Sequence, residues 1–235
     1  MLEVRDLHVH YGLSHALHGV TLGVGDGEVV GLFGRNGVGK TTLIKAIAGW
    51  LKPSRGVIQF GGKPLGGLQP DRICRLGIGL VPEDRRVFPG LTVEENLRLG
   101  FLQAPQRTKA LMAARLASVY ARFPRLAERR RHAGKSLSGG EQQMLAIARV
   151  LVGEPKLLLI DEPTEGLAPI VAEEIFALIA SLRSEGISVL LVEQHLHRAL
   201  DVCTRCYAMS RGQIVFEGGV AEPGERDALL AELAV

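Results

Sequence analysis

A short run of glycines with one lysine and one threonine is the part of the sequence whose chemistry is easiest to infer. The run, Gly34-x-x-x-x-Gly39-Lys40-Thr41, follows an apolar stretch and opens a stretch with helical character. Glycines let the backbone curl so that successive N–H groups point inward, and a helix N-terminus adds partial positive charge. Such a loop binds nucleotide phosphates, with the lysine on the outer phosphates and the threonine hydroxyl on magnesium. We therefore predict a site for ATP and Mg²⁺, whose loop residues are Gly34, Arg35, Asn36, Gly37, Val38, Gly39, Lys40, Thr41 and Thr42.

An Asp-Glu pair at the end of an apolar run supplies the acidic groups that such a site needs. Leu157 to Ile160 is apolar, and Asp161 and Glu162 follow it directly. In open α/β sheets, ligands bind at the carboxyl ends of the strands. We predict that Asp161 binds magnesium, directly or through water, and that Glu162 orients or deprotonates the attacking water. Such a pair is also an ordinary helix N-cap, but the phosphate loop favours the catalytic interpretation.

A second helix start with glycines follows Leu137. It reads Ser138-Gly139-Gly140-Glu141 and precedes a helical run that ends near Val152. Ser138 and Glu141 alone fit a capping box, but capping does not account for two consecutive glycines. Glycines there let the backbone approach a second anion closely. We predict that Ser138, Gly139, Gly140 and Glu141 contact ATP.

The chain around these motifs alternates between strand-like and helix-like segments. Strand patterns occur at 2–9, 28–33, 57–60, 78–81, 156–160 and 187–192, and helical patterns at 40–49 and 169–184. Another helix and a terminal hairpin around Arg211-Gly212 follow. Several strands are continuous apolar runs, which is typical of strands buried on both faces of a parallel sheet. The alternation predicts an α/β fold with a mostly parallel sheet.

Residues 92–131 differ in character, since they are rich in Ala, Leu, Arg and Glu. Leu111, Arg115, Val119 and Arg122 have helical spacing there. We interpret this stretch as the heart of a helical subdomain, inserted at about 84–152 into a single domain of residues 1–235.

Bulk properties exclude several classes of protein. The 235 residues carry a formal charge of +3, too little to indicate nucleic-acid binding by bulk electrostatics. The apolar runs are strand-length, far short of the roughly 20 residues of a membrane-spanning helix, and no secretory signal is evident. We therefore expect the chain in the cytoplasm. Cys203-x-x-Cys206 lacks the second ligand pair of a zinc site, so we interpret both as reduced packing cysteines.

Taken in order, the three motifs resemble those of the ATP-binding subunits of ABC transporters, and the resemblance covers essentially the whole chain. It implies a P-loop NTPase core, an N-terminal antiparallel β subdomain and an inserted helical subdomain. It also implies a head-to-tail dimer, in which Ser138 to Glu141 of one subunit close over the ATP of the other. Tyr11, in Val9-His10-Tyr11-Gly12, looks like the aromatic residue that stacks on adenine in that family.

Within the family, two segments resemble the ATPase subunits of branched-chain amino-acid importers, although urea and amide importers have similar ones. They are Val81 to Leu97 and Asp161 to Pro169. The resemblance implies membrane subunits, a second ATPase that is either a copy or a relative, and an indirect link to a solute-binding protein outside the cell. It places the chain on the inner face of the membrane. Glu83 to Leu99 and the adjoining helical subdomain are the expected contact surface for the membrane subunits.

Three positions depart from the family pattern. Glu83 stands where the family usually has a Gln that binds magnesium, and Ala168 stands where it usually has Asp. Spacing aligns Gln194 with the histidine that senses the γ-phosphate, whereas His195 lies one residue later, so either residue is a candidate. A soluble ABC ATPase of DNA repair is disfavoured because no long coiled coil separates the motifs. Intact Lys40, Asp161 and Glu162 disfavour a non-catalytic module.

Overall fold

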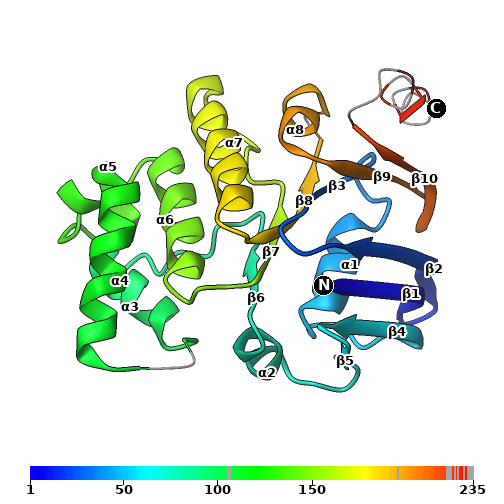
Figure 1. The fold of residues 1–235 in the computed structure, drawn as a ribbon, viewed down its shortest axis with the longest axis horizontal. Coiled ribbons are helices and arrows are strands. Elements are labelled where there is room, and N and C mark those ends of the chain that lie inside the picture. Colours follow the sequence, from blue (N-terminus) through cyan, green and yellow to red (C-terminus); the bar gives the residue numbers. More distant parts are fainter. Residues whose placement is uncertain are drawn as a thin grey trace.

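The computed structural model describes residues 1–104, 107–194 and 196–220, together with 224, 226, 228–229 and 231. Two sheets and a set of helices make up this part of the chain (Figure 1). The strands are β1 (Leu2–Tyr11), β2 (Ser14–Val24), β3 (Val29–Phe33), β4 (Arg55–Phe60), β5 (Lys63–Pro64), β6 (Ile78–Val81), β7 (Leu157–Asp161), β8 (Ser188–Glu193), β9 (Arg205–Ser210) and β10 (Gln213–Gly219). The helices are α1 (Lys40–Ile47), α2 (Pro70–Arg75), α3 (Val93–Phe101), α4 (Lys109–Arg122), α5 (Pro124–Glu128), a 3-10 turn (Gly134–Ser136), α6 (Gly139–Leu151), α7 (Pro169–Ser184) and α8 (Leu196–Val202).

The larger sheet is mostly parallel, as predicted. Its strand order is β10-β9-β3-β8-β7-β6, and only the edge pair β9–β10 is antiparallel. All residues of β3, β7 and β8 are buried, because both faces of the sheet are covered. Side chains alternate between the two faces, so Leu158 and Ile160 belong to one core cluster and Leu157 and Leu159 to the other.

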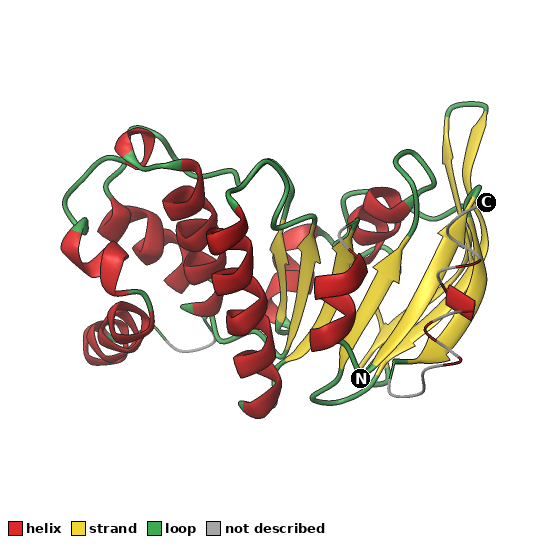
Figure 2. Ribbon diagram, turned by 90° about the horizontal axis from the view of Figure 1, so that it is seen from above, coloured by secondary structure: helices red, strands yellow, loops and turns green. Residues whose placement is uncertain are grey.

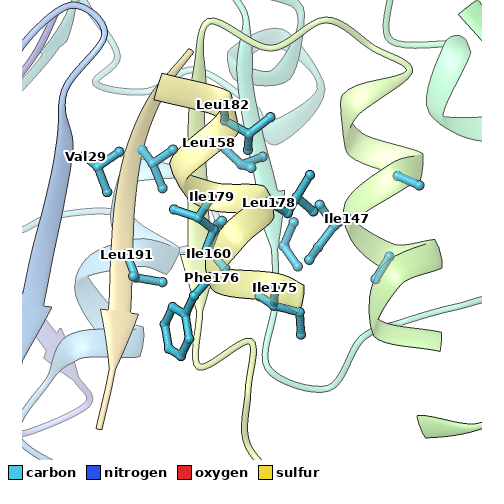
Figure 3. Packing of buried hydrophobic residues seen from close by; sticks show 14 of the residues in the cluster. Val29, Ile147, Leu158, Ile160, Ile175, Phe176, Leu178, Ile179, Leu182 and Leu191 are labelled. Carbon is cyan, nitrogen blue, oxygen red and sulfur yellow. The ribbon is translucent and has the colours of Figure 1, made fainter. Parts of the chain in front are cut away.

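The first core cluster joins this sheet to α6 and α7. In Figure 3, Ile175, Ile179 and Leu182 of α7 lie over Leu158 and Leu191 of the central strands. The apolar spacing i, i+4, i+7 places these three α7 residues on one side of the helix. This packing fixes the start of α7, and the loop before it, close to the end of β7.

The second core cluster lies between the two sheets. The smaller, antiparallel sheet has the order β2-β1-β4-β5, and α1 packs between it and the parallel sheet through Leu43, Ile44 and Ile47. The predicted α/β class is therefore confirmed, together with the antiparallel N-terminal sheet. The short helix α2 was not predicted.

Helices α3, α4 and α5 gather at the end of the molecule opposite the antiparallel sheet (Figures 1 and 2). Thr92 caps α3 with a complete capping box, and Thr108 caps α4. These helices lie within the stretch predicted to be helical. Helix α6 packs against α3 and α5, and also against β6, so it connects the helical subdomain to the core.

Candidate functional site

The predicted phosphate loop joins β3 to α1, and its conformation depends on glycines at defined positions. Gly37 and Gly39 have φ angles of 81° and 114°, values that L side chains rarely adopt. A Cβ on Gly34 would lie 2.4 Å from the backbone oxygen of Met209, and one on Gly39 would lie 2.8 Å from Leu17. Gly34 is therefore required by close packing against the backbone, and Gly39 mainly by its left-handed backbone angle. The backbone oxygen of Val38 accepts a hydrogen bond from Gly212, which anchors the loop to the β9–β10 turn.

Lys40 begins α1, and its side chain folds back over the loop. Only 4% of it is exposed. Its ammonium donates hydrogen bonds to the backbone oxygens of Gly34, at 2.7 Å, and Arg35, at 3.1 Å. It also lies 3.4 Å from Oε1 of Glu162. The structure thus brings the lysine of the first motif and the glutamate of the second into direct contact.

Asp161 ends β7 next to the start of α1, as the spacing of the motifs predicts. The pKa of Asp161 is raised to about 6, mainly by burial and also by the Glu162 and Glu83 carboxylates, whereas a hydrogen bond with the Thr41 side chain opposes the rise. Among the described residues, its Oδ1 has no hydrogen-bond partner although it is buried. A buried carboxylate oxygen without a partner, beside a threonine hydroxyl, fits the oxygen ligands that magnesium prefers. Asp161 and Thr41 would therefore hold Mg²⁺, which would supply positive charge beside the phosphates.

Glu162 follows with a φ of 46°, in the left-handed region that is unfavourable for most side chains. Its backbone N–H donates to Val192 of β8 at 2.9 Å, and its carboxylate accepts a hydrogen bond from the Gln194 side chain. This strained backbone turns the carboxylate toward Lys40 and the phosphate loop. Gln194 and His195 are the two candidates for the residue that senses the γ-phosphate. Gln194 contacts the predicted base, Glu162, and His195 lies outside the described residues.

Glu83 and Glu165 join Glu162 in an acidic cluster. Carboxylate oxygens of the three residues lie within 4.8 Å of one another. A hydrogen bond with Glu162, partial burial and the charges of Glu162, Glu83 and Glu193 raise the pKa of Glu165. Glu83 and Glu165 are exposed, whereas Glu162 is only 8% exposed. Glu165 was not predicted as a site residue, and its position four residues after Asp161 was the only available signal.

One cavity of about 250 Å³ connects these groups. It is lined by Asn36, Gly37, Gly39, Lys40, Thr41, Thr42, Glu83, Glu162 and Glu165. The predicted phosphate loop, the predicted base and two of the three predicted metal ligands, Thr41 and Glu83, therefore face the same space, whereas Asp161 is not among the lining residues. Its walls carry both a cation and several carboxylates, as a site for a phosphate–metal complex requires.

Glu193 is a buried acidic residue that the sequence analysis did not single out. It is 1% exposed, and its carboxylate accepts hydrogen bonds from the backbone and the hydroxyl of Thr164, at 3.2 and 2.6 Å. It also accepts one from the backbone of Gln194, at 3.0 Å. Glu193 thus ties the loop after Glu162 to the loop after β8. Its place at the end of a buried strand was the signal that could have identified it.

Tyr11 ends β1 beside the phosphate loop. Its side chain is 47% exposed, and its hydroxyl lies 3.5 Å from the hydroxyl of Thr42. An exposed aromatic ring next to a phosphate loop is suitably placed to stack on a base. The structure therefore places the predicted adenine contact at the edge of the phosphate site.

The second predicted helix start lies elsewhere. Ser138 caps α6 with a complete capping box, in which its backbone N–H donates to Glu141 at 2.8 Å and its hydroxyl accepts from the backbone of Glu141 at 3.3 Å. Arg129 forms an ion pair with Glu141 at 3.0 Å, and the hydrogen bonds from Ser138 lower the pKa of Glu141. Ser138, Gly140 and Glu141 line a different cavity, between α5, α6 and α7, which contains none of the phosphate-loop residues.

The two glycines of this helix start pack closely within the chain. A Cβ on Gly140 would lie 2.8 Å from Val171 of α7, and one on Gly139 would lie 3.1 Å from the Arg85 guanidinium. The contact with Val171 is a structural reason for Gly140 that does not depend on ATP. Ala168 is the N-cap of α7 and forms no side-chain cap, because alanine has no side-chain acceptor.

Two further expectations concern the cysteine pair and membrane-spanning helices. Cys203 and Cys206 are free thiols, 8% and 1% exposed, so both are buried packing residues as predicted. Over the residues that the structure describes, no helix has the length and apolar content needed to cross a membrane.

Comparisons with known proteins agree with this arrangement. The model of the ABC transporter family matches residues 17–165. The chain is 44% identical to the high-affinity branched-chain amino acid transport ATP-binding protein BraG of Pseudomonas aeruginosa, over 98% of this chain and 99% of that one. It is 35% identical to the probable branched-chain amino acid transport ATP-binding protein LivF of Archaeoglobus fulgidus, over 94% and 93% of the two chains. The solved ADP conformation of an ATP-binding cassette of an ABC transporter superposes with a TM-score of 0.88 at 28% identity, covering 100% of this chain and 96% of that one.

Proposed function

This chain belongs to the ABC transporter family as an ATPase subunit, and we propose that it powers an importer of branched-chain amino acids. The observation that carries the proposal is the 44% identity to BraG over nearly the full length of both chains. Identity over a whole subunit includes the surfaces that contact other subunits, which nucleotide motifs alone do not cover. The likeness to LivF supports the same solute class.

The positions of the residues around the cavity support a separate role for each of them in ATP hydrolysis. Lys40 and the loop N–H groups bind the phosphates, and Asp161 and Thr41 would bind Mg²⁺, with Glu83 as a further ligand. Glu162 takes the proton of the attacking water, and Gln194 holds the Glu162 carboxylate in place by the hydrogen bond between their side chains. Glu193 fixes the backbone at Gln194 and so supports that orientation.

The separation of the two helix starts supports assembly with a second ATPase. Ser138 and Gly140 do not line the cavity of their own phosphate loop. We therefore assign them to the ATP bound by a facing subunit, either another copy or a related chain. Within each subunit, we propose that residues 1–235 act as one domain with the helical subdomain inserted at about 84–152.

A groove between the core and the helical subdomain supports contact with membrane subunits. A cavity of about 390 Å³ there is lined by Trp50, Cys74, Pro82 and Arg86, among others. The Arg86 guanidinium lies 4.5 Å from the centre of the Trp50 ring, and Trp50 and Phe88 are 41% and 48% exposed. Exposed aromatic rings beside arginines are typical of protein interfaces. The groove adjoins the contact surface predicted from Glu83 to Leu99, which supports the proposal that the chain binds membrane subunits at the inner face of the membrane.

Affinity purification of the tagged chain from its native membrane tests the proposal. We expect two polytopic membrane subunits and a second ATPase to co-purify. Charge reversal at both Arg85 and Arg86 should abolish recovery of the membrane subunits, whereas reversal at exposed Lys63 on β5 should preserve it. Recovery of soluble partners alone would overturn the transport function while leaving the ATPase intact.

Uptake by whole cells tests the solute. Cells whose chromosomal copy carries Glu162→Gln should lose uptake of labelled leucine, isoleucine and valine. Uptake of these amino acids at the wild-type rate, together with loss of uptake of urea or an amide, would assign the subunit to a different importer.

A further inference from the structure

Four histidine side chains, which we call the histidine cluster, gather on β1 and β2, at the end of the molecule opposite the helical subdomain (Figure 1). His8 faces His18 across the two strands, and His10 faces His15. The His15 ring is central, with its centroid 5.2 Å from that of His8, 4.0 Å from that of His10 and 3.8 Å from that of His18. Because the rings are this close, the protonation of each depends on the charge of the others.

Hydrogen bonds limit how many protons the histidine cluster can hold. Nδ1 of His8 lies 3.1 Å from Nε2 of His15, and only one of these two nitrogens can carry the proton of that bond. Nε2 of His8 lies 3.1 Å from a carboxylate oxygen of Asp6, which only accepts, so His8 donates there. When both His8 and His15 are charged, each facing nitrogen holds a hydrogen, and the bond between the two rings is lost.

The charged groups around the histidine cluster can neutralise one positive charge but not a second. Asp6 of β1 pairs with His8 and also with Arg55 of β4, at 3.1 Å. Among the described residues, Asp6 is the one carboxylate in ion-pair contact with a ring of the cluster. Arg55 has the same charge as an imidazolium, and so does Arg211 in the turn between β9 and β10, which packs against His18. A second imidazolium would therefore lack a counter-ion.

The stretch of β2 that carries two of these rings also packs against the phosphate loop. The backbone N–H of His18 donates to Gly212 in the β9–β10 turn at 2.8 Å, and Gly212 donates to the backbone oxygen of Val38 at 2.9 Å. A Cβ on Gly39 would lie 2.8 Å from the Leu17 side chain. A shift of this part of β2 would therefore be felt at the phosphate loop.

The central ring of the cluster resists protonation. Burial and the charges of His10, His18 and His8 lower the pKa of His15 below its ordinary 6.5, whereas a hydrogen bond with the backbone of Leu17 opposes the change. The packed cluster thus binds this proton less tightly than a relaxed histidine does. Packing is therefore favoured above about pH 6.5 and is progressively lost as the pH falls below that value.

We propose that the histidine cluster is a pH-sensitive switch that lowers the affinity for ATP when the surroundings become acidic. At neutral pH the rings hold β1 and β2 together, and in acid the repulsion between charged rings loosens this hairpin. Tyr11, the predicted adenine contact, faces Ser14 in the pair next to His10 and His15, so its position depends on the hairpin. ATP binds the packed form more tightly, so protons weaken ATP binding and ATP opposes protonation.

ATP affinity at about pH 7.5 and about pH 5.5, measured by fluorescent nucleotide titration without Mg²⁺, tests the proposal. The wild type should lose about tenfold more affinity over this range than His15→Gln. The reason is that a relaxed histidine, with a pKa of about 6.5, is about ten times more often charged than neutral at pH 5.5. The phosphates of ATP and the carboxyl of Asp161 titrate in the same range, but they do so in both proteins and cancel in the comparison.

His132→Ala is the matched control, because His132 is an exposed histidine of the helical subdomain. This variant should keep the pH dependence of the wild type. An equal loss of affinity in the wild type and His15→Gln would overturn the proposal.

Nuclear magnetic resonance of the histidine ring protons measures the same coupling from the side of the proton. ATP should lower the pH midpoint of the His15 signal, identified by its absence from His15→Gln, by about one pH unit, which matches a tenfold change in affinity. The His132 signal should keep its midpoint. A His15 midpoint that ATP leaves unchanged would overturn the proposal as well.

Discussion

The phosphate-loop side of the nucleotide site and the Ser138 side differ in how well their polar groups are satisfied within the chain. On the phosphate-loop side, Lys40 is buried against backbone oxygens, Asp161 has an unpartnered buried oxygen, and three carboxylates lie within 4.8 Å of one another. On the other side, Ser138 and Glu141 satisfy each other in a capping box. The phosphate-loop side thus has a buried oxygen of Asp161 without a partner among the described residues, whereas on the Ser138 side the polar groups of the helix start satisfy each other and Ser138 remains exposed.

The largest expected effect follows from removing the predicted base on the phosphate-loop side. Glu162→Gln should lower ATP turnover by about 10³-fold, because general-base catalysis contributes on the order of 10²–10⁴-fold. ATP binding should persist, since Lys40 and the loop are unchanged. Phosphate release and nucleotide binding, measured on the same preparation, check both expectations. Glu165→Gln, which alters the same acidic cluster, should lower turnover less than tenfold, and equal losses in the two variants would refute the role of Glu162.

A change at Ser138 separates capping from contact with a facing ATP. Aspartate caps helices as well as serine does, so Ser138→Asp should keep α6 stable. Its negative charge should repel the phosphates held by the facing subunit and lower turnover by about 100-fold, comparable to the loss of a transition-state hydrogen-bond donor. Thermal unfolding and phosphate release are the measurements. Unchanged turnover would restrict Ser138 to a role within its own chain.

The charged carboxylate of Asp161, on the phosphate-loop side, should lower the free energy of unfolding of the ligand-free chain. The pKa of Asp161 is about 6 in the folded chain, above the value of about 3.9 for an unfolded aspartate. The folded state therefore binds the proton more tightly, and wild-type stability falls as pH rises from about 4 to about 6. Asp161→Asn should raise the free energy of unfolding of the ligand-free chain by about 3 kcal/mol at pH 7, at 1.36 kcal/mol per unit of pKa.

This gain should vanish below about pH 4, where the wild-type carboxyl is protonated in both states. Urea unfolding at several pH values measures it. Added Mg²⁺ and ATP should stabilise the wild type but give little stabilisation to the variant. A variant less stable than the wild type at pH 7 would show that the carboxylate of Asp161 has favourable interactions within the ligand-free chain.

The smallest effect is expected at the rim of the site. Tyr11→Ala should weaken ATP binding by about tenfold, because stacking of a base on an aromatic ring contributes roughly 1–3 kcal/mol. Tyr11→Phe keeps the ring and loses the hydroxyl near Thr42, so it should bind ATP nearly as well. Fluorescent nucleotide titration distinguishes the two. Equal weakening in both variants would assign the effect to the hydroxyl.

The sequence predicted those parts of the fold whose pattern is local. The strand Ile78–Val81 and the helix Pro169–Ser184 have the predicted bounds, because apolar runs and proline mark them clearly. The meeting of Lys40, Asp161 and Glu162 followed from a general rule for parallel sheets. Glu165 and Glu193 were missed because their roles depend on the loops after β7 and β8 lying side by side.

The ring contacts among His8, His10, His15 and His18 on β1 and β2 could not be predicted for a similar reason. Val9 faces Leu17 but His10 faces His15, so Ala16 is an extra residue in β2. This bulge brings His15 and His18, which are three positions apart, onto one face. Strict strand alternation would place them on opposite faces.

Measurement of ATP-dependent dimer formation is the most direct test of the comparison between the phosphate-loop side and the Ser138 side. The molar mass of Glu162→Gln would be followed by light scattering with and without ATP, both alone and mixed with the second ATPase recovered from the membrane. We predict a dimer that forms only with ATP, and a monomer when Ser138→Asp is added in the same background, although ATP still binds. A monomer in saturating ATP in every mixture, or a dimer indifferent to Ser138→Asp, would contradict the assignment of Ser138 to the ATP of a facing subunit.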